Sequence, residues 1–125
     1  MIRDIFKERL IIAYGLNSEE LEKLNLKFKE ACKKPALVIT PDMGECTLEE
    51  ILNDKELKLG LKQLPNEKIV IFNGFKGVYL NQGVKKVREV LGSEPILAST
   101  TPNSIKMPLF ELVSHLVQER ALYKK

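Results

Sequence analysis

The segment TPDMGECTLEEIL, residues 40–52, recurs in altered form as TPNSIKMPLFELV, residues 101–113. A shift of 61 residues superimposes the two segments. A shift of 59 residues aligns the chain before them, where Gly15 falls on Gly74. Similarity at a fixed spacing is typical of a duplicated supersecondary unit. We therefore predict an internal duplication within a single domain.

The two predicted copies, residues 9–60 and 68–122, have the same order of elements: strand, glycine, helix, strand, TP loop, helix. Short apolar runs rich in Ile and Val predict the first strand of each copy, and such runs are typical of strands covered on both faces. A proline precedes or opens each second strand, a position where no ladder donor is lost. The four predicted strands are residues 10–14, 36–40, 69–72 and 96–100.

Helix signals follow the strands. Asn17 with Glu20 matches the capping-box spacing, although Ser18 is a competing cap, and Thr47 with Glu50 matches it fully. The apolar stripe of the first helix extends to Cys32. The last helix, which starts near Pro108, has the longest stripe, formed by Leu109, Leu112, Val113, Leu116 and Val117.

These elements predict an α/β fold in which two tandem βαβα pseudo-repeats form one small, mainly parallel, four-stranded sheet with flanking helices. A ferredoxin-like α+β fold is the alternative, since it joins two βαβ halves as an antiparallel sheet. The order of the strands does not follow from the sequence.

Composition limits the classes of protein. The chain has 125 residues, 44% hydrophobic and 30% charged, which is typical of a globular domain. Its longest apolar runs are far shorter than the roughly 20 residues that span a membrane. Charges interrupt the N-terminal segment MIRDIFKERL, so no signal peptide is expected there. We expect a cytoplasmic protein with two reduced cysteines.

Charge is distributed unevenly. Residues 1–60 contain ten Lys or Arg and twelve Asp or Glu, a net charge of −2, whereas residues 61–125 contain ten and five, a net charge of +5. The lysines of the basic half are scattered, without aromatic residues between them for base stacking. Nucleic-acid binding is therefore not expected, and the two halves, or two copies of the chain, would attract each other.

The sequence contains few groups suited to catalysis. His115 is the only histidine and falls outside the apolar stripe of its helix, which predicts a solvent-exposed residue. Glu50 and Glu111 occupy matching positions, where helix capping accounts for them. No nucleophile motif, phosphate-binding loop or metal-ligand spacing is present. We therefore expect no cofactor and no metal, and we favour a non-enzyme over an enzyme of unrecognised type.

A candidate ligand site follows from the fold class. Ligands of parallel α/β sheets bind outside the carboxyl ends of the strands, where helix N-termini offer N–H groups to anions. We expect the site, if present, in the second copy, because Asp42 of the first copy would repel an anion. Turn and cap chemistry alone also explains these residue types. The candidate ligand-binding residues are Gly15, Thr40, Asp42, Gly74, Thr100, Thr101, Asn103 and Lys106.

The segments IVIFNGF at 69–75 and ILASTTPNSIKMPLFELVSHLVQE at 96–119 resemble an uncharacterised bacterial family, the domain of unknown function three-seven-eight-three. The resemblance covers residues 68–120, and residues 9–53 are a looser copy with GL for GF and TPD for TPN. Both copies lack the Trp expected after the TPN segment. The resemblance implies no activity.

Two functions stay open. The first is a non-enzymatic interaction or regulatory module that contacts a protein partner or a second copy of itself. The second is a binder of a small anionic or nucleotide-like ligand at the TP loops.

Overall fold

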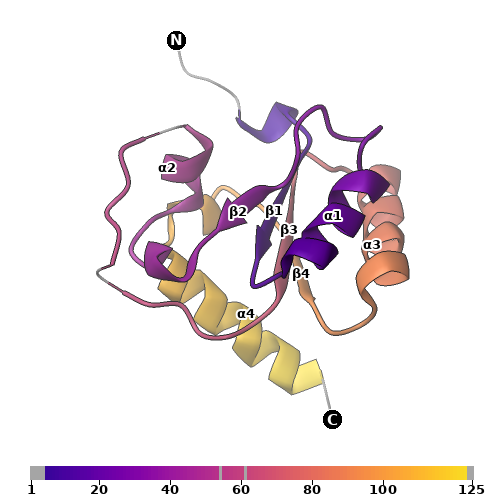
Figure 1. Ribbon diagram of the computed structural model, residues 1–125. Coiled ribbons are helices and arrows are strands. Elements are labelled where there is room, and N and C mark those ends of the chain that lie inside the picture. The colour runs from indigo at the N-terminus through magenta and orange to yellow at the C-terminus, as the bar shows by residue number, and fades with distance from the viewer. Residues whose placement is uncertain (1–4, 54, 61, 124–125) are drawn as a thin grey trace. The chain divides into compact units, whose positions relative to one another are not determined.

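The computed structural model describes residues 5–53, 55–60 and 62–123 (Figure 1). It divides into two compact units. Among the described residues, the sheet unit comprises residues 5–39 and 67–100, and the helical unit comprises residues 40–53, 55–60, 62–66 and 101–123. Each unit therefore combines residues from both predicted copies.

The sheet unit contains a four-stranded sheet in the order β2-β1-β3-β4. β1 pairs with β2 in parallel and β3 pairs with β4 in parallel, whereas the central pair, β1 and β3, is antiparallel. The predicted α/β class and the mainly parallel sheet are confirmed. The strand order is not that of the ferredoxin-like alternative, because the two parallel strands of each half are direct neighbours here, whereas a ferredoxin-like sheet places an antiparallel strand between them. The strands are β1 (Leu10–Tyr14), β2 (Leu37–Ile39), β3 (Ile69–Asn73) and β4 (Ile96–Ser99).

The register of the central pair is symmetric. Ile12 lies opposite Ile71, and these two residues are 59 positions apart in the sequence. The residue pairs at the two ends of the β1–β3 ladder are also equivalent, since Leu10 lies opposite Asn73 and Tyr14 lies opposite Ile69. Two copies related by a twofold axis between β1 and β3 would have this register, and a duplication with a 59-residue shift predicts it.

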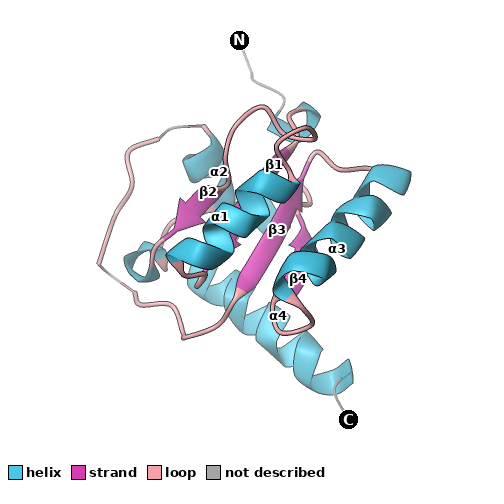
Figure 2. Ribbon diagram, turned by 45° about the vertical axis from the view of Figure 1, so that its right-hand side comes forward, coloured by secondary structure: helices cyan, strands magenta, loops and turns pink. Residues whose placement is uncertain are grey.

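Helices α1 (Ser18–Lys27) and α3 (Val78–Leu91) lie side by side on one face of the sheet (Figure 2). The rings of Phe28, Phe72 and Phe75 form the centre of the core beneath them, with centroids 5.4 to 6.3 Å apart. A fully buried side chain of this size contributes about 1.5–3 kcal/mol relative to an exposed one. A short 3-10 helix, η1 (Ile5–Lys7), precedes β1.

Local signals place the ends of these helices. Asn17 caps α1, and the complete capping box with Glu20 is present, with hydrogen bonds of 2.8 and 3.0 Å. α3 ends at Gly92, which has a positive φ. The prediction that Cys32 belongs to the first helix is wrong, because α1 ends at Lys27 and a turn follows. Cys32 is nevertheless buried in the core, as its stripe position predicted.

The helical unit contains η2 (Pro41–Met43), α2 (Leu48–Leu52), η3 (Ser104–Lys106) and α4 (Leu109–Tyr123). The capping box of Thr47 and Glu50 is confirmed. Thr47 forms a β-bridge to Pro108, its equivalent under the 61-residue shift. The apolar stripe of α4 is confirmed: Leu109, Leu112, Val113 and Leu116 are buried. No helix in the described part of the chain is long and apolar enough to cross a membrane.

Candidate binding site

Two of the predicted site residues, Gly15 and Gly74, lie at opposite ends of the sheet. Because β1 and β3 are antiparallel, Gly15 follows β1 at the end where β3 begins, and Gly74 follows β3 at the end where β1 begins. The expectation that the candidate residues meet at one edge of the sheet, with Lys106 nearby, is therefore wrong for Gly15 and Gly74. Both glycines have positive φ angles, 78° and 79°, and a Cβ atom would overlap the carbonyl oxygen of Glu67 or of Glu8. The tight turns account for both glycines.

Thr100 lies near Gly74, at the end of β3. Its Oγ1 donates a 2.8 Å hydrogen bond to Oδ1 of Asn73, and the Asn73 Nδ2 donates a 2.9 Å bond to the Glu8 carbonyl. Asn73 is completely buried, so these bonds satisfy a polar group that would otherwise destabilise the fold. Thr100 thus has a structural role. Asn73 could not be singled out from the sequence, because it ends an apolar strand whose neighbouring strands are distant in the chain.

The TP loops in the helical unit satisfy their own polar groups. The Thr40 hydroxyl donates to the carboxylate of Asp42. Thr101 and Ser104 exchange hydrogen bonds of 2.8 and 2.9 Å between side chain and main chain. These bonds support the turn-and-cap interpretation of these residues. Asn103 and Lys106 are exposed.

The start of α4 has no donors to spare for an anion. Pro108 has no N–H, the Leu109 N–H donates to the Cys46 carbonyl at 2.8 Å, and the Phe110 N–H donates to the Gly44 carbonyl at 2.9 Å. The Glu111 N–H donates to Pro108. The N–H groups that the anion hypothesis requires are therefore occupied by main-chain acceptors.

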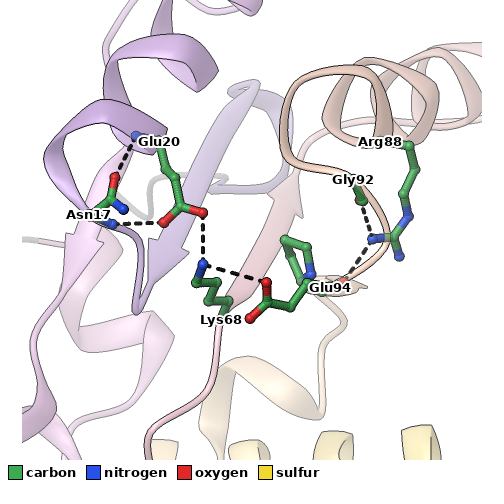
Figure 3. A network of polar contacts seen from close by, with 7 residues as sticks. Asn17, Glu20, Lys68, Arg88, Gly92 and Glu94 are labelled. Atoms are coloured by element: carbon green, nitrogen blue, oxygen red, sulfur yellow. Dashed lines mark hydrogen bonds and ion pairs between the residues drawn. The ribbon is translucent and has the colours of Figure 1, made fainter.

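The two ends of the α1–α3 pair differ in chemistry. At the first end, called the closed end, Lys68 lies 2.9 Å from Glu20 and 3.6 Å from Glu94 (Figure 3). The hydrogen bond from Lys68 is the main cause that lowers the pKa of Glu20, and the same bond raises the pKa of Lys68. Arg88 donates to the carbonyls of Gly92 and Pro95, at 3.0 and 2.9 Å. At this end Lys68 is therefore paired with two carboxylates, and Arg88 is held by main-chain acceptors.

The second end, called the open end, carries Arg9 and Tyr79, which are the equivalents of Lys68 and Glu20 under the 59-residue shift. The Arg9 guanidinium stands 4.2 Å from the centroid of the Tyr79 ring. A cation–π contact of this kind leaves the positive charge unneutralised. Arg9 makes no ion pair with another described residue, so its charge is available to a ligand.

Three hollows in the sheet unit share lining residues from one to the next, and the middle one includes the open end. The outer hollow, about 530 Å³, is lined by Lys7, Arg9 and Lys33. The middle hollow, about 210 Å³, shares Arg9 and Ala31 with it. The helix hollow, about 450 Å³, lies along α1 and α3 and shares Glu30 and Lys86 with the middle one. We call these three hollows together the basic groove.

Cations dominate the basic groove. Its lining contains seven Lys or Arg residues and two Glu residues. Two of the cations are paired, since Lys23 contacts Glu19 at 3.3 Å and Lys27 contacts Glu89 at 2.7 Å. The other five have no ion pair with another described residue. They are Lys7, Arg9, Lys29, Lys33 and Lys86.

Sequence reasoning missed the basic groove. Four of its five unpaired cations come from residues 7–33, within the half of the chain whose net charge is −2. Lys86 comes from the other half and reaches the groove because α1 and α3 lie side by side. A regional sum of charges does not reveal this cluster, because most of the acidic residues described in the first half line none of the three hollows.

The remaining reactive side chains are not arranged for chemistry. Both cysteines are buried, and burial is the main cause that raises the pKa of each thiol, which keeps it protonated and inert. His115 is exposed, as predicted. The described residues contain no group of three His, Cys, Asp or Glu that could hold a metal ion.

The fold and the groove define a small α/β protein with a basic surface and a mixed sheet. Residues 68–123 match the family model described as "Domain of unknown function (DUF3783)". This match confirms the predicted resemblance of the second copy, and the looser likeness of residues 9–53 stays a prediction. Neither the curated proteins nor the solved structures contain a match to this chain at the significance applied.

Proposed function

We propose that this protein is a non-enzymatic interaction module that binds an acidic segment of a partner protein in the basic groove. The observation that carries the proposal is the set of five unpaired cations along three connected hollows. An acidic segment that lies along the hollows would neutralise these charges in turn. Complementary charge of this kind accelerates association and selects the partner.

The shape of the groove favours an extended ligand over a small ion. The middle hollow shares lining residues with both the outer hollow and the helix hollow, and these two share none with each other. A single phosphate would occupy one hollow and leave the other cations unpaired. An extended chain reaches all three.

The acidic side chains in the groove favour a polypeptide over a nucleic acid. Glu8 lines the outer hollow, and Glu30 lines both the middle and the helix hollows. Carboxylates accept hydrogen bonds from the main-chain N–H groups of a peptide, and a sugar-phosphate backbone has no N–H groups to donate. Phe28 and Phe75 are buried, with 3% and 8% of their surface exposed, so they offer no open ring face to a stacked base.

The proposal is tested by fluorescence anisotropy with a labelled peptide of ten glutamates. We expect binding that weakens as salt is raised, because exposed charges are screened beyond about 8 Å at physiological ionic strength. Lys86→Glu should weaken binding about tenfold, since it removes one cation and adds a repulsive charge. Lys85→Glu is the matched control, because Lys85 is an exposed neighbour on α3 outside the groove lining, and its effect should be small.

Two results would contradict the proposal. Equal losses in the Lys86 and Lys85 variants would show that only the net charge of the protein matters. Tighter binding of a ten-nucleotide single-stranded RNA than of the peptide, lost in the Lys86 variant, would assign the groove to nucleic acid.

A further inference from the structure

The middle hollow of the basic groove differs from its neighbours in size and lining. Its volume, about 210 Å³, is smaller than the roughly 300–1,000 Å³ of ordinary small-molecule pockets. It is therefore suited to one side chain. The larger hollows on both sides of it leave room for the residues that precede and follow that side chain.

Aromatic rings line this hollow. Phe28, Phe75 and Tyr79 border it, and the Phe28 and Phe75 rings meet edge to face at 6.0 Å. Gly83 lies at its base, where α3 passes so close to the rings that a Cβ atom would stand 3.0 Å from Phe72. Phe28 and Phe75 are nearly buried, whereas Tyr79 is half exposed, so a ring entering the hollow would pack chiefly against Tyr79, beside the small exposed parts of the two Phe rings.

Cations flank the same rings. Arg9 stands over Tyr79 at 4.2 Å, and the Lys86 Nζ lies 5.6 Å from the centroid of Phe28. Both cations line the hollow, so an aromatic ring inserted there would be a neighbour of two positive charges. An aliphatic side chain would gain burial in the hollow but no attraction to the cations.

The closed end lacks this arrangement. Under the 59-residue shift, the positions of Phe75, Phe28 and Tyr79 correspond to Leu16, Val87 and Glu20. Aromatic residues are therefore concentrated at one end of a symmetric frame, the end whose cations are unpaired. Core packing alone does not require aromatic residues at these positions, since Leu16, Val87 and Glu20 occupy the equivalent positions at the closed end.

We propose that the middle hollow is a socket for an aromatic side chain, so that the partner of this protein is an acidic segment with an aromatic residue at its centre. This inference rests on the proposed function of the basic groove. The ring would anchor the segment in the socket, and acidic residues before and after it would contact the cations of the outer and helix hollows. Interfaces commonly combine one buried aromatic anchor with a charged surround.

The experiment uses three labelled peptides of equal charge, each with five glutamates on both sides of a central Phe, Leu or Ala. We expect the Phe peptide to bind about tenfold more tightly than the Ala peptide, with the Leu peptide between them. Equal affinity of the Phe and Ala peptides would overturn the socket. Equal affinity of the Phe and Leu peptides would overturn its aromatic selectivity.

A blocked socket provides the second measurement. Gln82 is an exposed residue of α3 that lines the middle hollow, so Gln82→Trp should fill the hollow without disturbing the core. The preference for Phe over Ala should then fall to about one, while the salt-dependent binding of the Ala peptide persists. Asn81→Trp, at the exposed neighbouring position outside the lining, should leave the preference unchanged.

The outcomes separate this inference from the proposed function. Salt-dependent binding of all three peptides with one affinity would support the basic groove and overturn the socket. If none of the three peptides bound, both the proposed function of the basic groove and the socket would be overturned. A preference for Phe that survives Gln82→Trp would place the anchor elsewhere and overturn the socket.

Discussion

The closed and open ends of the α1–α3 pair occupy equivalent places in a nearly symmetric sheet unit, yet they treat charge in opposite ways. At the closed end, Lys68 holds Glu20 and Glu94 in an ion-pair network. At the open end, Arg9 has the ring of Tyr79 as its contact. One backbone frame therefore supports a self-sufficient network and a cation available to a ligand. This break in the symmetry of the sheet unit is what directs the proposed binding to the open end.

The shared frame is tested by substitutions that should affect both ends alike. Gly15→Ala and Gly74→Ala should each destabilise the protein by about 3 kcal/mol, because each places a side chain at a positive φ and against a main-chain oxygen. Urea denaturation measures the change. Gly92→Ala is the control: its φ is also positive, but no atom lies within 4 Å of the new Cβ, so a cost of about 1 kcal/mol is expected. Unequal effects at positions 15 and 74 would show that the two ends do not share one frame.

The second prediction converts the open end into a copy of the closed one. Tyr79→Glu should let Arg9 form the ion pair that Lys68 forms with Glu20, and it also removes a ring of the proposed socket. We expect the affinity for the acidic Phe peptide to fall about tenfold, or about 1.4 kcal/mol, with little change in stability. The measurement is anisotropy, together with a thermal melt.

A matched charge change is the control for that substitution. Val78→Glu adds the same charge at an exposed neighbouring position outside the lining of the groove, and a roughly twofold loss is expected. A loss as large as that of the Tyr79 variant would mean that the added charge, and not the capture of Arg9, decides the affinity.

The third and smallest effect concerns the closed end. The pKa of Glu20 is lowered in the folded protein, chiefly by its hydrogen bond with Lys68, so its contribution to stability is present above the ordinary pKa of 4.5 and is lost as pH falls through the lowered value. Glu20→Gln should therefore cost about 1 kcal/mol near pH 7 and flatten the fall in stability between about pH 5 and 3. Denaturant unfolding at several pH values measures both effects.

Glu22→Gln is the control for this pH dependence, because Glu22 is an exposed residue of the same helix. We expect its unfolding free energy to follow that of the unchanged protein at each pH. If the Glu20 variant lost no stability near neutral pH, the closed end would be held together by its packing and not by the ion pairs.

Several elements followed from the sequence because their causes are local. Apolar runs placed the strands, and residues three apart placed the capping boxes of Asn17 and Thr47. Gly92 marked the end of α3 in the same way. The end of α1 was predicted too far along the chain, because the apolar spacing continues to Cys32 through a turn that keeps Cys32 in the core.

The candidate site did not follow, because its position depends on how the halves pair. Nothing within β1 or β3 specifies that the two strands run antiparallel, and this pairing alone sends Gly15 and Gly74 to opposite ends of the sheet. The predicted site at one edge of the sheet is therefore not formed. Thr40 and Thr101 make hydrogen bonds within their own turns.

The sequence by itself determined the strands, the helix caps, the tight turns and the likeness of residues 68–123 to a family of unknown function. These features depend on residues a few positions apart or on a recurring pattern. The tertiary structure alone decided the mixed sheet and the basic groove, because both depend on contacts between residues far apart in the chain. Arg9 and Lys86 line the same hollow only once β1 has paired with β3 and brought α1 beside α3.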